Sequence, residues 1–283
     1  MTKTLKAADN VDQQTVDSFA DEWSRYDQSD VSEAELRRIF ENYFHVFPWD
    51  RLPASACGFD MGCGTGRWAK LAAERVGHLT LVDVSDKTLD VARMNLAELE
   101  NVSFLQGTAN KVALDKCSQD FGYSLGVLHH VPDTTLALAA CVELLKPGAP
   151  FLVYLYYRFD NRPKWFVAVW RISEAARAMV SKMPARLKYL LTDLIAVIVY
   201  WPLARLARLS ETLGLKSTNL PLYGYRNYSL YTMRTDSRDR FGTPLEQRFT
   251  REEIRSMMEA AGLTDIVISD REPYWCAVGV KNA

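Results

Sequence analysis

The stretch that decides the fold is DMGCGTG, at residues 60–66. It follows ACGF at 56–59, which has the pattern of a short strand, and RWAKLAAERV at 67–76 continues as a helix. Glycines at such a turn let the backbone bend tightly and approach a bound nucleotide without a Cβ in the way. Arg67 stands where the dinucleotide fingerprint needs its third glycine, and no lysine follows as in a phosphate loop. The loop therefore argues against nicotinamide and flavin cofactors.

Strands and helical segments alternate after this loop. Four more strands are expected, at LTLVDVS (79–85), VSFLQG (102–107), QDFGYSLGVLHH (119–130) and FLVYLYY (151–157). Far downstream, a helix at 249–263 with a Thr250 to Glu253 capping box precedes two last strands, DIVISD (265–270) and YWCAVGVK (274–281). This alternation predicts an α/β fold whose parallel sheet is covered by helices on both faces.

Residues from about 158 to 246 interrupt the alternation. Between Arg158 and Ser210 there are ten basic residues and three acidic ones, among many aliphatic side chains. Two helices are expected, at about 164–180 and 186–209. The longest uncharged run, Leu194 to Ala204, is shorter than the roughly 18 to 20 residues that cross a bilayer, so no transmembrane helix is expected. The apolar faces of these helices would cover the sheet, a substrate, a partner subunit or a membrane surface.

Composition narrows the class of protein. The 283 residues carry a formal charge of −1, so nothing in the total charge predicts an affinity for nucleic acid. The five cysteines include no Cys-x-x-Cys pair and no His at zinc spacing, which predicts a reduced protein without a metal site. The first thirty residues lack the apolar run of a signal peptide. These features predict a cytoplasmic location.

Together the motifs resemble the class I methyltransferases that use S-adenosylmethionine. The resemblance covers roughly residues 52–157 and 247–283, and it implies a doubly wound, mostly parallel seven-stranded sheet with an antiparallel last strand. In that family the glycine loop cradles the methionine part of the cofactor, and an acid after the second strand accepts hydrogen bonds from both ribose hydroxyls. The implied cofactor residues are Asp60, Gly62, Cys63, Gly64, Gly66, Asp83 and Val84.

Further pocket residues follow from the same resemblance. Thr108 and Ala109 lie where the family often has an Asp for the adenine amino group, so backbone groups are expected to serve there. Leu125 belongs to SLGVLHHVPD (124–133), which looks like the family segment that lines the methyl-transfer site. His129 and His130 are candidate general bases, because imidazole titrates near neutrality, or they only line the pocket.

The acceptor is expected to meet a segment rich in tyrosine and arginine, between Leu220 and Glu246. One interpretation is a lid in which tyrosines pack on an apolar or planar acceptor and arginines hold a carboxylate or phosphate. The other is a surface loop in which Arg and Tyr stack together. Tyr156, at the end of the fifth strand, is expected either to supply a catalytic hydroxyl or only to line the wall of the pocket. The candidate substrate-binding residues are Tyr157, Tyr223, Tyr225, Arg226, Tyr228, Tyr231 and Arg234.

Three parts of the chain are therefore expected: an N-terminal helical cap at 1–50, a cofactor-binding domain at 51–157 and 247–283, and a helical insertion with a lid at 158–246. Trp23 and Tyr26 of the cap would close over the cofactor or pack against the sheet.

The resemblance implies methyl transfer from S-adenosylmethionine to a small-molecule acceptor, with oxygen favoured over carbon or nitrogen. In-line displacement at an activated sulfonium needs no metal. Two alternatives stay open: a peripheral membrane methyltransferase for a lipid, prenyl or quinone-like acceptor, touching the membrane through 164–209, and a non-catalytic cofactor-binding or scaffold protein. A homodimer is also left open. A nucleic-acid acceptor is not expected, because the fourth strand has no N/D-P-P-Y/F/W motif.

Overall fold

The computed structural model describes residues 10–28, 30–215 and 218–282, and these residues divide into two units. The sheet unit consists of Leu36–Arg158 with the segments up to Gln28 and from Leu245 onward. The helical unit consists of Phe159–Pro244 with the segment that ends at Glu35. Of the expected cap at 1–50, residues 1–9 and 29 lie outside the described residues, as do 216–217 of the expected insertion.

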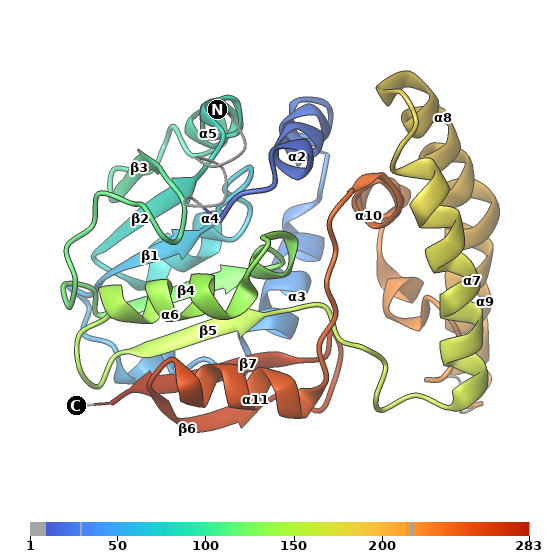
Figure 1. Cartoon of the computed structure of the whole chain (residues 1–283). Helices are drawn as coiled ribbons and strands as arrows, with labels where there is room; N and C mark the ends of the chain where they lie inside the picture. The colour runs from blue at the N-terminus through green and yellow to red at the C-terminus, as the bar shows by residue number, and fades with distance from the viewer. Residues whose placement is uncertain (1–9, 29, 216–217, 283) are drawn as a thin grey trace. The chain divides into compact units, whose positions relative to one another are not determined.

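One seven-stranded sheet forms the centre of the sheet unit, in the order β3-β2-β1-β4-β5-β7-β6 (Figure 1). Neighbouring strands from β1 to β5 are parallel, and β7 runs antiparallel to both β5 and β6. The predicted fold class is confirmed. The strands are β1 Cys57–Met61, β2 His78–Asp83, β3 Val102–Gln106, β4 Phe121–Leu125, β5 Pro150–Tyr154, β6 Leu263–Ile268 and β7 Cys276–Lys281.

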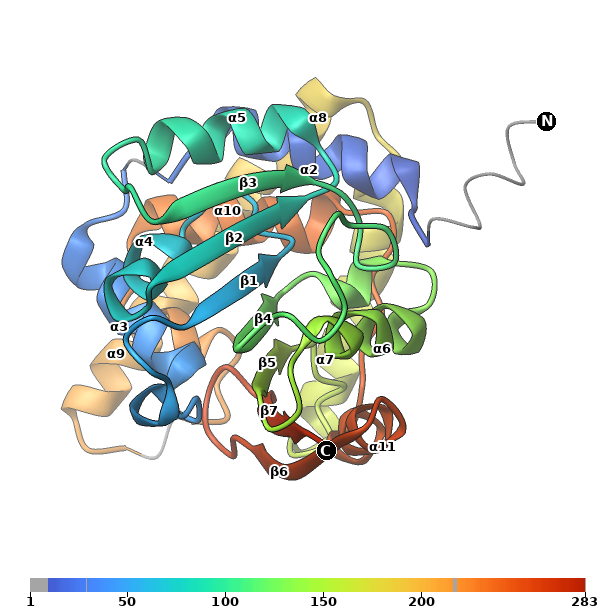
Figure 2. The ribbon, with the colours of Figure 1, turned by 90° about the vertical axis from the view of Figure 1, so that its left-hand side faces the viewer.

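Helices cover both faces of this sheet. Figure 2 shows α6 (Thr134–Leu144) and α11 (Arg251–Ala260) on one side, and α3 (Glu33–Phe44) and α4 (Ala69–Ala72) on the other. The remaining described helices of the unit are α2 (Gln13–Arg25), α5 (Asp86–Asn95) and three short 3₁₀ turns, at Trp49–Arg51, Ala73–Arg75 and Leu128–His130. A further 3₁₀ turn, Tyr223–Asn227, belongs to the helical unit. The predicted capping box of Thr250 and Glu253 is present at the start of α11.

Aromatic rings fit against glycines where β1 and β4 lie side by side. A Cβ on Gly58 would lie 2.3 Å from the Phe121 ring, and a Cβ on Gly122 would lie 2.4 Å from the Phe59 ring. Phe59 belongs to the apolar core that α6 and α11 cover. Because β1 pairs in parallel with both β2 and β4, the carboxyl ends of the three strands lie at one edge of the sheet, where ligands of open α/β sheets bind.

Four α-helices build most of the helical unit, and two of them belong to one continuous helix. The predicted helix at 164–180 is α7 (Lys164–Val180). The predicted helix at 186–209 is a longer continuous helix, Ala185–Thr212, made of α8 (Ala185–Ile195), a π-helical segment (Ala196–Tyr200) and α9 (Trp201–Thr212). Because a π segment widens the turn before Pro202, the helix continues through a residue that lacks an N–H. The fourth helix is α10 (Leu230–Gly242).

The helix Ala185–Thr212 is long and apolar enough to cross a membrane by length and composition. This differs from the sequence expectation, which counted only the uncharged run from Leu194 to Ala204. The helix extends beyond both ends of that run. Of its most apolar window, 28% is buried inside the structure. Because core helices of soluble proteins reach the same length and hydropathy, the packing of this helix decides between the two arrangements.

Candidate active site

The glycine loop after β1 is held in a conformation that side chains rarely adopt. Gly62, Gly64 and Gly66 have φ angles of +78°, +55° and +78°. A Cβ on Gly62 would lie 2.4 Å from the Val127 side chain, and one on Gly66 would lie 2.7 Å from Leu96. The backbone amides of Gly62 and Cys63 donate to one carbonyl of β2, at 2.7 and 2.9 Å. The loop is therefore fixed against the end of β2 and needs its glycines.

Asp83, the last residue of β2, joins the loop to that strand. Its Oδ2 accepts a hydrogen bond from the Gly64 amide at 3.2 Å, and its Oδ1 accepts one from the Ser85 amide at 2.9 Å. Burial raises the pKa of Asp83 to about 6, although these amides hold it back. Each carboxylate oxygen keeps a second lone pair that can accept another hydrogen bond.

A second carboxyl, Asp60, lies inside the sheet beside Tyr123. Within the described chain, neither Asp60 oxygen nor the Tyr123 hydroxyl has a hydrogen-bond partner, and both side chains are buried. Burial raises the pKa of Asp60 to about 8. The nearby Tyr123 hydroxyl, which does not meet hydrogen-bond geometry, lowers this pKa in part, and the charge of Asp83 raises it further. Buried polar groups are normally hydrogen-bonded, so this pair is suited to a polar ligand group or a water.

The helix α2 places aromatic rings against the loop. The Trp23 indole Nε1 lies 3.5 Å from the position of a Cβ on Gly64. Phe19, one turn earlier, stacks on Trp23 with ring centroids 6.2 Å apart and meets the His130 ring edge-on at 5.0 Å. The interpretation of Trp23 as a residue that closes over the loop is therefore consistent with its position.

Next to the loop, the third strand ends at the two residues expected near adenine. The Gly107 amide donates to the Asp83 carbonyl at 3.0 Å, which brings the turn after β3 to the end of β2. The backbones of Thr108 and Lys111 pair, while the buried Thr108 hydroxyl has no partner among the described residues. Ala109 packs against the apolar core. Val84 is partly buried beside Asp83.

The two histidines lie on a 3₁₀ turn, not on the strand predicted for QDFGYSLGVLHH, because β4 already ends at Leu125, which is buried. The His129 ring is fully buried, with its centroid 4.0 Å from that of His130 and 3.9 Å from that of Tyr156. Neither nitrogen of His129 has a hydrogen-bond partner within the residues described. Burial lowers the pKa of His129 well below its usual value, so this imidazole is neutral at pH 7.

The segment 245–248, which we call the strap, follows the helical unit and holds this turn. The His130 Nδ1 donates to the Leu245 carbonyl at 2.7 Å, which fixes the tautomer of that ring. The Gln247 amide donates to the His129 carbonyl at 3.0 Å, and its side chain donates to the Val131 carbonyl at 2.6 Å. The strap therefore couples the His129 backbone and the His130 ring to residues more than a hundred positions later.

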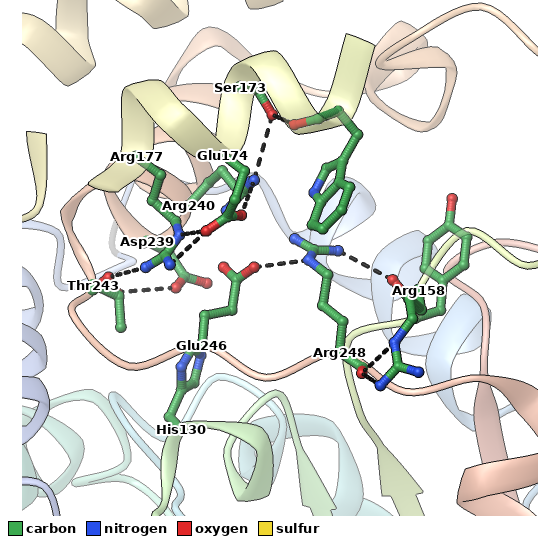
Figure 3. Close-up of polar contacts among 12 residues, drawn as sticks. His130, Arg158, Ser173, Glu174, Arg177, Asp239, Arg240, Thr243, Glu246 and Arg248 are labelled. Carbon is green, nitrogen blue, oxygen red and sulfur yellow. Dashed lines mark hydrogen bonds and ion pairs between the residues drawn. The ribbon is translucent and has the colours of Figure 1, made fainter. Parts of the chain in front are cut away.

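The same strap carries a charged pair that the sequence interpretation missed. Arg248 donates from Nε to Glu246 at 2.7 Å, and both side chains are almost wholly buried (Figure 3). The Arg248 guanidinium lies 5.0 Å from the centre of the Tyr156 ring and also donates to the Tyr157 carbonyl. The ion pair thus fixes the positively charged Arg248 guanidinium beside Tyr156 and His129. Nothing in the local sequence indicates this, because the contact crosses about ninety positions.

Tyrosines continue this wall along β5, which ends at Tyr154 and not at Tyr157 as predicted. Tyr154 meets the Tyr43 ring edge-on at 4.9 Å and lies 5.9 Å from Tyr156. Tyr157 points elsewhere, with its ring 5.4 Å from Tyr274. Tyr156 therefore lies with the histidines, and Tyr157 packs on the connection between β6 and β7.

The match to known proteins covers the same stretch. Residues 59–153 match the model of a methyltransferase domain, and this range includes the glycine loop, Asp83 and both histidines.

This chain carries a class I methyltransferase domain.

The methyltransferase domain has relatives with quinone-related names. The chain is 40% identical over 110 residues to a ubiquinone biosynthesis O-methyltransferase of Alkalilimnicola ehrlichii, a match that covers 38% of this chain and 43% of the relative. It is 30% identical over 129 residues to a demethylmenaquinone methyltransferase of Staphylococcus epidermidis, covering 44% of this chain and 52% of the relative. The chain thus spans about half the length, or less, of these curated relatives.

Solved structures of similar fold extend beyond the methyltransferase domain. A protein of Methanosarcina mazei described as an S-adenosylmethionine-dependent methyltransferase aligns over 86% of this chain and 97% of its own, with a TM-score of 0.50 and 14% identity. At this identity the likeness concerns the fold alone.

The other expected acceptor residues belong to the helical unit, whereas the methyltransferase domain belongs to the sheet unit. There, Arg234 makes a two-pronged ion pair with Asp193, and Arg226 and Tyr223 both bond Glu211. Arg226 also stacks on the Tyr223 ring at 3.8 Å. Tyr225 packs between Tyr200 and Tyr228, and Tyr231 lies on α10.

Much of that segment is a helix and not a loop. Ser229 caps α10 by accepting from the Thr232 amide, and Glu35 accepts from Ser229 and Thr232. The inward residues of α10 are largely polar, which hides the helix from a search for apolar spacing. Among the described residues, no cluster of three or more His, Cys, Asp or Glu side chains could hold a metal ion.

Proposed function

We propose that this protein transfers a methyl group from S-adenosylmethionine to a small-molecule acceptor. The observation that carries the proposal is the bond between the Gly64 amide and Asp83, because it joins a loop with three glycines to a carboxylate at the end of β2. This is the arrangement in which a nucleoside lies across the ends of two parallel strands.

The residues of the pocket fit the methyl donor. Asp83 would accept the ribose hydroxyls with its remaining lone pairs, and Gly62, Gly64 and Gly66 would leave room for the methionine chain beside Cys63. Asp60, whose oxygens lack partners among the described residues, would accept from the donor's ammonium group directly or through a water. Val84, Thr108, Ala109 and Leu125 would surround the adenine and the sulfonium.

The reaction is an in-line displacement. The sulfonium supplies an activated methyl group; the acceptor atom forms the new bond to the methyl carbon while the old bond's electron pair returns to sulfur. The chain's task is to hold the acceptor in line and to exclude water, which accounts for much of the acceleration and requires no metal. When the acceptor is a hydroxyl, its proton must pass to a base.

His129 is our first choice for that base. Its ring is neutral, so the nitrogen that carries no hydrogen can accept a proton, and no hydrogen bond within the described chain fixes which of the two nitrogens that is. His130 is the second choice, and its bond to the Leu245 carbonyl leaves Nε2 as the acceptor. Tyr156 would orient the acceptor beside His129, with Arg248 fixing its ring.

We infer an acceptor with a hydroxyl on a planar ring, methylated at oxygen in preference to carbon or nitrogen. Two relatives are named for quinone biosynthesis, and the wall formed by Tyr43, Tyr154 and Tyr156 offers flat rings to a planar molecule. The acceptor contacts expected of Tyr157 and of the tyrosines and arginines of the helical unit stay predictions; within that unit Arg226 and Arg234 are paired with acids.

Incubation of the purified protein with methyl-labelled S-adenosylmethionine and a panel of catechols, hydroquinones and aliphatic alcohols tests the proposal. We expect label to appear in a phenolic ether, identified by mass spectrometry. Donor binding without transfer to any acceptor would favour the non-catalytic alternative. Absence of donor binding would contradict the proposal.

A further inference from the structure

The long helix Ala185–Thr212 packs on only one of its faces. Six residues spaced three or four apart are buried within the helical unit: Tyr189, Thr192, Ala196, Tyr200, Ala204 and Ala207. Tyr200 and Ala204 share one apolar cluster with Val180 of α7 and Met233 of α10. The helix is therefore held along one side over its 28 residues, about 42 Å.

Its opposite face presents large apolar side chains to solvent. Leu187, Leu190, Leu194, Ile198 and Trp201 follow at the same intervals of three or four residues, and all are exposed. Leu190 and Ile198 are 64% and 61% exposed. Soluble proteins scatter exposed apolar residues singly, whereas a continuous stripe marks a surface that meets another apolar phase.

The helix α7 repeats this pattern. Trp165, Val169, Ile172 and Met179 are exposed at helical spacing, and Ile172 is 73% exposed. The small residues Ala168, Ala175 and Ala178 between them are exposed too, so the stripe is not interrupted by a polar side chain other than Arg171. We call the exposed apolar residues of α7 and of Ala185–Thr212 the apolar stripes.

The exposed charges around the apolar stripes are mostly positive. From 164 to 212 the exposed charged residues are Lys164, Arg171, Lys182, Arg186, Arg208 and Glu211, and Glu211 at the end of the helix is paired with Arg226. The other two acids of this range are half-buried and paired: Glu174 with Arg177 and Arg240 (Figure 3), and Asp193 with Arg234. The solvent-facing apolar side chains are thus accompanied by five cations and by one acid, Glu211, which is itself paired with Arg226.

We propose that the apolar stripes lie flat in the surface of an anionic lipid membrane. The leucines, Ile198 and Trp201 would enter the boundary between headgroups and acyl chains, and the five cations would contact lipid phosphates. A second copy of the chain fits this surface poorly, because two identical cationic faces repel. This inference does not depend on the methyl donor or on the proposed reaction.

The packing of the helix also decides against a transmembrane arrangement. A spanning Ala185–Thr212 would take α10 into the bilayer with it, since α10 packs on the buried face. The buried side of α10 carries Thr232, Thr235, Ser237 and Arg238. Polar and charged groups at that depth are costly, whereas a helix lying in the interface leaves α10 outside the lipid.

Flotation of the full-length protein with vesicles tests the proposal. We expect binding to phosphatidylcholine vesicles that contain phosphatidylglycerol, weaker binding to pure phosphatidylcholine, and release by high salt. The double variant L190Q/I198Q should lower the partition coefficient about tenfold or more, because two exposed apolar side chains no longer enter the lipid. The matched control M94Q/L136Q alters two equally exposed apolar residues of the sheet unit and should bind as the wild type does.

The charge contribution has its own variant. R186E/R208E should abolish the preference for anionic vesicles, while K70E, an exposed cation of α4, should not change it. Far-ultraviolet circular dichroism checks that each variant keeps its helices. Three results would overturn the proposal: wild-type protein that stays with neither vesicle, a stable dimer by light scattering that L190Q/I198Q dissociates, or a membrane fraction that resists alkaline carbonate.

Discussion

The two units bury different kinds of side chain. In the sheet unit the largest fully buried side chains are apolar, as with Phe59, Leu81 and Phe151, whereas in the helical unit the buried set includes Arg238, Thr192 and Ser237. On the surface the helical unit is the more apolar of the two: most exposed large apolar residues of the described chain lie between Trp165 and Leu215. The sheet unit is therefore organised by apolar burial in water, and the helical unit leaves apolar surface for another phase.

Two isoleucines give the sharpest contrast between the units. Ile254 of α11 is fully buried and Ile172 of α7 is 73% exposed. I254A should lower the free energy of unfolding by about 2–5 kcal/mol, because it leaves a cavity. I172A should change it by less than about 0.5 kcal/mol. Urea unfolding of both variants measures this, and equal losses would mean that the apolar stripe is packed in solution.

The glycine loop offers a contrast within the sheet unit. Gly62 and Gly148 have similar φ angles of +78° and +81°, but a Cβ on Gly148 would meet nothing within 4 Å. G62A should cost about 2–4 kcal/mol from strain and from the clash with Val127, and should abolish donor binding. G148A should cost only about 1 kcal/mol and leave binding intact. Thermal unfolding with and without S-adenosylmethionine distinguishes them.

Single alanine substitutions of His129 and His130 distinguish a general base from a residue that only lines the pocket. If His129 takes the acceptor's proton, H129A should lower kcat about 100-fold with little change in KM for the acceptor. H130A should then lower kcat less. A rise in KM alone for both variants would assign the histidines to the pocket wall.

The buried carboxyl should appear in the pH dependence of stability. The pKa of Asp60 is raised to about 8, above its ordinary value, so the folded state keeps a proton that the unfolded state releases. Stability should therefore fall as the pH rises from 7 toward 8, by about 1.4 kcal/mol per unit at most. D60N should flatten this slope, whereas D86N, at an exposed position of α5, should not. Chemical unfolding at several pH values gives the slope.

The sheet was predictable because its strands are apolar runs separated by helices, and the glycine loop and Asp83 carry their own spacing. The residues at which strands end were harder to predict: β4 ends at Leu125, so His129 and His130 lie on a turn after it. The helix α10 escaped notice because polar residues fill its buried side, where tertiary hydrogen bonds to Glu35 replace apolar packing. Glu246 and Arg248 could not be found at all, since only the fold brings them to Tyr156.

We propose that the Asp83 carboxylate, at the end of β2, binds the ribose of the methyl donor. Isothermal titration calorimetry with S-adenosylmethionine compares wild type, D83A and the control D90A, an exposed carboxylate of α5. We expect D83A to weaken binding about tenfold or more, because hydrogen bonds to a charged acceptor are lost, and D90A to bind like the wild type. Equal affinity for D83A and wild type would mean that Asp83 does not hold the ribose.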